Sequence, residues 1–229
     1  PSKLTRNYTL GMLVAIYASS HVDRQIVSIL AESIKQDLLL SDTQLGFLIG
    51  LSFAIFYATL GIPIAILADR YSRRNIIAIS VIIWSGMTAL CGLAGSCVQL
   101  ALARIGVGIG EAGSSPPSHS MISDLYPPEK RATAMGIYAA GINVGVLLGF
   151  LVGGWIDEWY GWRMAFFVVG LPGILLGLLM FFTVQEPTRT QAPKPMPKNV
   201  FTEVWDTFKI MMAIPSLRHI VIGTTLVVF

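Results

Sequence analysis

The chain has 229 residues, of which 54% are hydrophobic and 13% are charged, and its formal net charge is +3. Soluble domains carry about 25% charged residues, so this composition excludes an ordinary soluble domain and indicates a membrane protein. The basic residues are not interleaved with aromatic residues as they are in nucleic-acid-binding surfaces, so we expect no nucleic-acid partner.

Six apolar stretches approach the roughly 20 residues that a helix needs to cross a bilayer. They cover residues 8–30, 44–68, 75–96, 98–120, 132–155 and 163–183. The sequence therefore predicts an all-α membrane protein with a six-helix transmembrane bundle over residues 1–184. A cytoplasmic linker with an amphipathic helix is expected over residues 185–213, and residues 214–229 are expected to begin a seventh span. This organisation predicts the first half of a longer protein.

The distribution of positive charge predicts the orientation in the membrane. If the first end is cytoplasmic, only Lys35 and Arg163 lie on the opposite side, while most other Lys and Arg residues are cytoplasmic. We expect a multi-pass protein of the cell (inner) membrane with a cytoplasmic N-terminus. The two cysteines and three scattered histidines lack the spacing of a metal site, so no metal, no cofactor and no enzyme activity are expected.

The first span carries two charges well inside its apolar stretch, Asp23 and Arg24. A charge within a membrane helix is costly unless it faces the bundle interior or a wet cavity, so both should point inward. Tyr17, Ser20 and Arg24 lie near one helical stripe and are candidates for lining a cavity. An ion pair between Asp23 and Arg104, holding the first span to the fourth, is compatible with this interpretation.

The second span contributes aromatic residues and ends in a charged turn. Phe53, Phe56 and Tyr57 are candidates for an apolar compartment, with plain helix packing as the alternative. The turn then contains the four residues Asp69, Arg70, Arg73 and Arg74. We predict that they form a cytoplasmic gate, a set of ion pairs that closes and opens across the helix ends. The alternative is simple anchoring by positive charge, which does not require Asp69.

The fourth span places Arg104 and Glu111 seven residues apart, on one helix face and about 10 Å apart along the axis. Gly106, Gly108 and Gly110 lie between them and allow a neighbouring backbone to come close. The run also contains a formal GxGxxG, but it lacks the strand that a nucleotide-binding fingerprint requires. We therefore predict that this helix lines a transport cavity. Pro116 and Pro117 should break or kink it near its cytoplasmic end.

The fifth span repeats glycine every four residues at Gly141, Gly145, Gly149 and Gly153. This spacing forms a smooth ridge that favours close helix packing. We expect a packing and rocking surface.

Several of these motifs resemble the major facilitator superfamily. Asp69, Arg70, Arg73 and Arg74 match its G-x-x-x-D-R-x-G-R-[RK] motif, although Ala65 and Ser72 replace the two glycines. Further strings are similar to the spinster family within it. They are residues 21–25 (HVDRQ), 67–74 (LADRYSRR), 104–112 (RIGVGIGEA), 122–126 (ISDLY) and 186–187 (EP).

The resemblance implies a twelve-helix fold of 3+3 inverted repeats in each half, in which a second six-helix bundle of the same protein completes a monomer. It also implies a proton-coupled secondary transporter of a lipid-like amphiphile, such as a lysophospholipid or a sphingoid phosphate, working by alternating access. Asp23, Arg104 and Glu111 then become candidates for proton coupling and substrate contact. The alternatives are transport of a small organic anion and, in another class, a membrane channel or non-transporting receptor.

Overall fold

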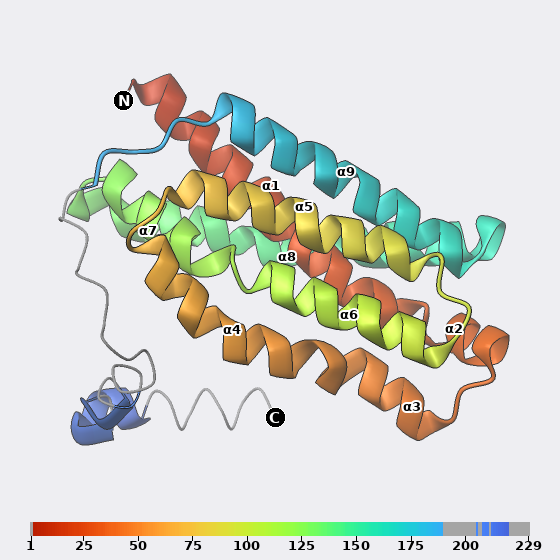
Figure 1. Cartoon of the computed structure of the whole chain (residues 1–229). Coiled ribbons are helices and arrows are strands. Elements are labelled where there is room, and N and C mark those ends of the chain that lie inside the picture. Colours follow the sequence, from red (N-terminus) through yellow and green to blue (C-terminus); the bar gives the residue numbers. More distant parts are fainter. Residues whose placement is uncertain (1, 190–204, 206–207, 211, 220–229) are drawn as a thin grey trace. The chain divides into compact units, whose positions relative to one another are not determined.

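The computed structural model describes residues 2–189, 205, 208–210 and 212–219, and the secondary structure within these residues is helical, without strands. The chain forms two compact units, Pro1–Ala192 and Pro193–Phe229. The first unit is a bundle of helices that run side by side along most of their length (Figure 1).

The bundle begins with the long helix α1 (Lys3–Ile29), followed by the short helix α2 (Ala31–Leu38). Helix α3 (Asp42–Gly46) continues through a π-helical turn (Phe47–Leu51) into α4 (Ser52–Ala68). The remaining helices are α5 (Arg73–Cys91), α6 (Cys97–Glu111), α7 (Ser115–Leu125), α8 (Pro128–Tyr160) and α9 (Trp162–Thr183).

Local sequence accounts for many of the helix ends. Ser2, Ser72 and Ser96 each precede a helix and accept a hydrogen bond from a backbone N–H of its first turn, at 3.2, 3.3 and 3.3 Å. Such caps satisfy donors that the helix itself leaves unpaired. Gly161 separates α8 from α9 with a φ of +80°, a backbone conformation that favours glycine.

Four of the expected spans correspond to helices long and apolar enough to cross a membrane: Asp42–Ala68, Arg73–Cys91, Pro128–Tyr160 and Trp162–Thr183. Helix α1 has the length, with 27 residues, but its charged residues lower its hydropathy. The expected fourth span is divided, because α6 ends at Glu111 after 15 residues and α7 begins at Ser115. The break therefore precedes the proline pair, and Pro116 and Pro117 fall in the first turn of α7, where proline is tolerated.

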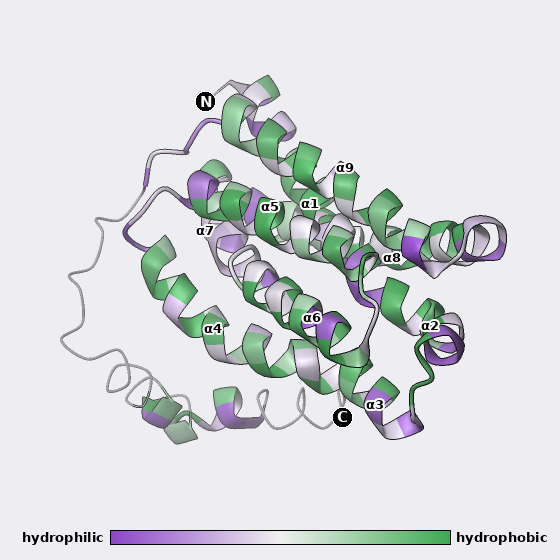
Figure 2. Ribbon diagram, turned by 45° about the vertical axis from the view of Figure 1, so that its right-hand side comes forward, coloured by the Kyte–Doolittle hydropathy of each residue, from purple (hydrophilic) through white to green (hydrophobic). Residues whose placement is uncertain are grey.

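Helix packing follows the small residues. Figure 2 shows hydrophobic residues along the lengths of the helices and hydrophilic ones gathered toward their ends. Helix α5 packs against α6 and α9, while α1 packs against α8. The four glycines of α8 are buried against α1, and a methyl group at Gly145 would overlap the carbonyl oxygen of Ala18. The structure confirms the predicted packing role of this glycine ridge.

Most of the expected amphipathic helix and seventh span lies outside the described residues. Within these stretches the structure describes residues 205, 208–210 and 212–219. All of them except Ile214 are helical. Both expectations stay predictions.

Candidate functional site

Four charged side chains from α1 and α6 form a buried group, which we call the charged cluster: Asp23, Arg24, Arg104 and Glu111. Arg24 Nε donates to Glu111 Oε2 at 2.7 Å, and the Glu111 side chain is fully buried. Asp23 and Arg104 are also buried, at 1% and 2% exposure. The cluster contains two carboxylates and two guanidinium groups, so its formal charges cancel when all four are ionised.

Glycines in α6 bring the neighbouring helices onto the charged cluster. A methyl group at Gly108 would lie 2.7 Å from the backbone oxygen of Phe53 on α4. One at Gly110 would lie 2.7 Å from Trp84 Cβ on α5. Because only a residue without a side chain permits such approaches, the glycine-rich sequence of α6 positions Phe53 and Trp84 beside the charges.

Two aromatic rings of α4 cover the cations of the cluster. The Cζ atom of Arg24 lies 5.1 Å from the ring centroid of Phe53 and 4.6 Å from that of Tyr57. Arg104 Cζ lies 5.2 Å from the Phe53 centroid. These distances suit cation–π attraction, which stabilises a guanidinium away from water. Phe53 and Tyr57 stack on each other at 5.3 Å, so α4 presents a continuous aromatic wall to the cluster.

Asp23 is held differently from Glu111. Neither of its carboxylate oxygens has a hydrogen-bond partner among the described residues. Arg104 reaches only the backbone oxygen of Asp23, at 3.5 Å, while Thr88 and Trp84 of α5 lie beside the carboxylate without making a hydrogen bond to it. A buried polar group without partners is costly, so this carboxylate is a place where a proton or a water molecule would be stabilising.

The pairing in the cluster differs from the sequence-based expectation. The sequence put Arg104 and Glu111 on one face of the fourth span and allowed an ion pair between Arg104 and Asp23. The structure instead pairs Glu111 with Arg24, which we had expected only to line the cavity. The helix period correctly put Arg104 and Glu111 in the interior, but it could not show which face of α1 meets them.

The other expected cavity-lining residues have varied environments. Tyr17 stacks on Tyr138 of α8, with ring centroids 4.3 Å apart. Ser20 is buried at 1% exposure, and its hydroxyl donates to the Tyr17 carbonyl at 2.9 Å, so it serves the helix rather than a cavity. Phe56 is half-buried on α4.

Arg73 is the centre of a second buried network, at the opposite end of α5 from Cys91. Its Nη1 donates to Asp124 of α7 at 2.5 Å and to Ser120 at 2.9 Å. Its Nε donates to Glu186 at 2.9 Å, and its Nη2 to the Pro187 carbonyl at 3.0 Å. With a side chain only 2% exposed, Arg73 joins α5, α7 and the segment after α9.

The other residues of the expected gate surround this network. The backbone N–H of Arg74 donates to Glu186 at 2.8 Å, and Arg70 donates to the Ile66 carbonyl at 2.8 Å. Asp69 is exposed, and its backbone oxygen accepts from Arg189. The gate prediction named the arginines but missed their acidic partners, Asp124 and Glu186. Both lay in strings that carry the spinster resemblance, although nothing in their spacing pointed to Arg73.

Glu186 lies outside the membrane-spanning helices and is half-buried. Burial alone would raise the pKa of its carboxyl group. The hydrogen bonds from the Arg74 N–H, Arg73 and Ser72 outweigh burial, so the pKa of Glu186 is lowered from its ordinary value. The carboxylate is therefore stabilised in its charged form.

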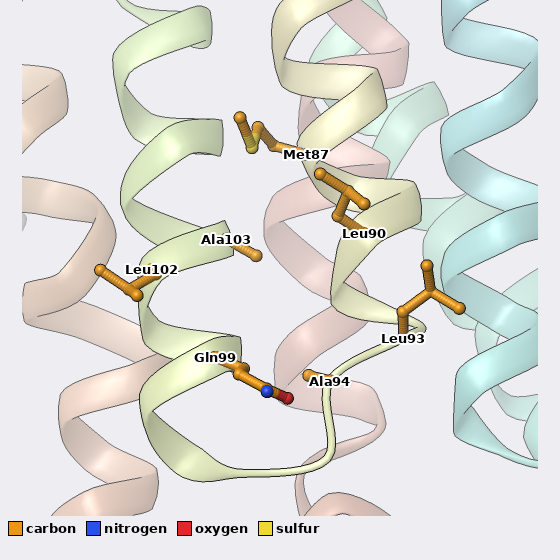
Figure 3. Close-up of a pocket in the computed structure, with 7 residues that line it drawn as sticks. All are labelled: Met87, Leu90, Leu93, Ala94, Gln99, Leu102 and Ala103. Carbon is orange, nitrogen blue, oxygen red and sulfur yellow. The ribbon is translucent and has the colours of Figure 1, made fainter.

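Two grooves lie away from the charged cluster. The first, between α5 and α6, is lined by apolar residues except for Gln99 (Figure 3). Gln99 Oε1 already accepts from the Gly95 N–H at 2.8 Å. The second groove lies between α1 and the start of α8 and contains Asn7, Tyr126, Lys130 and Thr133. Neither groove includes a residue of the charged cluster.

Comparison with known proteins identifies the family of this chain. The model of the Major Facilitator Superfamily matches residues 13–229. The chain belongs to this superfamily. Relatives of this chain are named as transporters.

Two solved structures share the superfamily fold with this chain. One is a bacterial homologue of the human lysosomal transporter Spinster, inward-facing and unoccupied, with a TM-score of 0.81 and 40% identity. It aligns with 94% of this chain and 50% of that one. The occupied form of such a homologue gives a TM-score of 0.78 at 42% identity, over 88% of this chain and 48% of the other.

Curated relatives include an MFS-type efflux pump of Mycolicibacterium smegmatis, 38% identical over 76% of this chain and 41% of that protein. A probable galactarate/D-glucarate transporter of Bacillus subtilis is 30% identical over 80% of this chain and 42% of its own length. The hexuronate transporter of the same organism is 31% identical over 77% and 42%. The chain thus spans less than half the length of these curated relatives.

Proposed function

We propose that the protein carrying this chain is a secondary transporter that works by alternating access and couples an anionic substrate to protons. The observation that supports this most is the Arg24–Glu111 ion pair at 2.7 Å inside an apolar bundle. Buried charges of this kind are costly and mark substrate and proton pathways in membrane proteins. In this proposal a second six-helix bundle completes the cavity.

The ion pair links protonation to anion binding. Arg24 retains 29% side-chain exposure, whereas Glu111 has none, so the arginine is the member that a ligand can reach. While Glu111 is ionised, it occupies the guanidinium and competes with a substrate anion. Protonation of Glu111 releases Arg24 for the substrate, so a proton and an anion bind best together. Asp23, whose oxygens lack hydrogen-bond partners, is a second candidate proton acceptor.

The substrate we propose first is a lipid-like amphiphile with an anionic head group, of the lysophospholipid or sphingoid phosphate type. The similarity to the bacterial Spinster homologue supports this choice, as does the aromatic wall of Phe53 and Tyr57 beside Arg24. A small organic anion is the second candidate, because relatives are named as transporters of galactarate, glucarate and hexuronate. Both substrates would place a negative group on Arg24.

The Arg73 network is proposed as the cytoplasmic gate. Arg6, Arg74 and Arg131 lie near the starts of α1, α5 and α8, in keeping with a cytoplasmic N-terminus. A reporter that is active only in the cytoplasm should be active when fused after Tyr126. A reporter that is active only outside the cell should be active when fused after Gly161. The reverse pattern would refute the proposed orientation.

The decisive experiment is transport into proteoliposomes by the full protein and its Glu111→Gln variant. We expect uptake by the variant to lose its dependence on an imposed pH gradient, because glutamine keeps the shape of the side chain but cannot release a proton. Exchange of labelled substrate without a gradient should persist. Glu129→Gln, an exposed acid on α8, is the matched control and should behave as the unmodified protein does.

The same assay separates the candidate functions. A labelled lysophospholipid and galactarate are offered in parallel, and preference for one identifies the substrate class. Saturable exchange supports a transporter, whereas ionic conductance supports a channel. A Glu111→Gln variant that kept the full response to pH would exclude Glu111 as the proton carrier.

A further inference from the structure

The second groove, between α1 and α8, has a volume of about 500 Å3. Along each helix its polar residues precede its apolar ones, so the groove has a polar half and an apolar half. Asn7, Tyr126, Lys130 and Thr133 form the polar half. The apolar half is lined by Leu10, Gly11, Ala134 and Ile137. At Gly11 no atom lies within 4 Å of the position that a methyl group would take, so the space above this residue is open.

One cation lines the polar half of this groove, and a second contacts the ring of Tyr126, which also lines it. Lys130 lines it and is exposed, and the Cζ of Arg6 lies 4.7 Å from the ring centroid of Tyr126. In the part of the chain that the structure describes, neither cation forms an ion pair with a carboxylate. The Nε of Arg6 is buried and has no hydrogen-bond partner there. The polar half therefore has excess positive charge and unused donors.

We propose that this groove binds an anionic phospholipid, with the phosphate at Lys130 and Arg6 and an acyl chain along Leu10, Gly11 and Ile137. Basic pockets between membrane helices suit lipid head groups. The cations lie at the end of the bundle, where head groups lie, and the apolar half extends from there along the helices. This inference does not depend on the transported substrate or on proton coupling.

The form of the groove favours a lipid over a free phosphate ion. A free phosphate would use only the polar half and would leave the apolar half without a role. Apolar side chains are also exposed here, since Ile137 of the groove is 50% exposed and Leu4, near the start of α1, is 83% exposed. Such side chains are stable in contact with lipid tails.

The test is native mass spectrometry of the full protein, titrated with phosphatidylglycerol or phosphatidylcholine of identical acyl chains. Lys130→Gln should weaken phosphatidylglycerol binding about fivefold, as expected for one basic residue near an anionic lipid. Binding of phosphatidylcholine should not change. Gly11→Leu should fill the open space and remove the preferred phosphatidylglycerol site.

Each control variant carries the same kind of substitution at a position outside the groove. Lys35→Gln removes a charge at the other end of the bundle, and Gly136→Leu adds the same side chain at an open position on α8 that does not line the groove. Both should bind phosphatidylglycerol as the unmodified protein does. A melting curve for each variant verifies the fold.

Three outcomes would overturn the proposal. The first is that Lys130→Gln and Gly11→Leu bind phosphatidylglycerol as their controls do. The second is that inorganic phosphate displaces phosphatidylglycerol from the groove as effectively as added phosphatidylglycerol does, which would identify a free-anion site. The third is that the two groove variants lose a protein dimer rather than lipid, which would assign the groove to a second copy of the chain.

Discussion

At the scale of single residues, three arginines inside the bundle have different roles, and two of them, Arg73 and Arg104, are buried. Arg24 pairs with Glu111 through a charged hydrogen bond of 2.7 Å. Arg104 meets a backbone carbonyl and the face of Phe53. Arg73 has two acidic partners, Asp124 and Glu186. The interaction partners, rather than the residue type, therefore determine what each substitution should do.

Arg73→Gln should destabilise the bundle by about 3–5 kcal/mol, since it leaves two acids facing each other without their shared cation. Arg74→Gln should cost about 0–1 kcal/mol, because the hydrogen bond from residue 74 to Glu186 comes from the backbone and survives. Thermal unfolding in detergent compares the two. Equal losses in stability would show that Arg73 is not the centre of the network.

At the scale of helices, contact between α1 and α8 depends on the glycine ridge. The ridge residue Gly145 faces the backbone of Ala18, whereas Gly154, one position beyond the ridge, has open space around it. The two glycines lie on the same helix in similar sequence, so they provide a matched pair.

Gly145→Ala should destabilise the bundle by about 1–3 kcal/mol, because the added methyl group forces the two helices apart. Gly154→Ala should be neutral or stabilising by up to about 1 kcal/mol, as alanine favours a helix. Melting temperatures of the purified variants provide the measurement. If Gly145→Ala were as stable as Gly154→Ala, close α1–α8 contact would not be needed.

At the scale of the whole bundle, Glu186 connects the segment after α9 to α5. Since the pKa of Glu186 is lowered in the folded state, this group adds stability at pH values above the ordinary glutamate pKa, which is about 4.3. That contribution is lost as the pH falls through the lower, folded value. Acid should therefore loosen this end of the bundle.

Glu186→Gln should lower stability at neutral pH and flatten the loss of stability as the pH falls below the ordinary glutamate pKa of about 4.3. Glu129→Gln, which replaces an exposed acid, should keep the slope of the unmodified protein. Melting curves recorded from neutral pH down through this pKa test the prediction. An unchanged slope in Glu186→Gln would place the acid response elsewhere.

Composition and hydrophobic periodicity, without any structure, predicted the all-helical fold, which the structure confirms. They also predicted six spans, of which four correspond to helices long and apolar enough to cross a membrane. They also placed Asp23, Arg104 and Glu111 in the interior, because a charge in an apolar stretch must avoid lipid. The glycine ridge of α8 followed from its four-residue spacing. The twelve-helix assembly, the monomer and the roles of the site residues stay predictions.

The tertiary structure alone decided which charges meet. Arg24 and Glu111 are 87 positions apart in the chain, and Arg73 and Glu186 are 113 apart. The sequence pattern gives the face of each helix that is buried, since hydrophobicity acts on each residue separately. It does not give the rotation and axial shift of one helix against another, because these depend on how all the side chains at a contact fit together. For that reason Arg24, rather than Arg104, became the partner of Glu111.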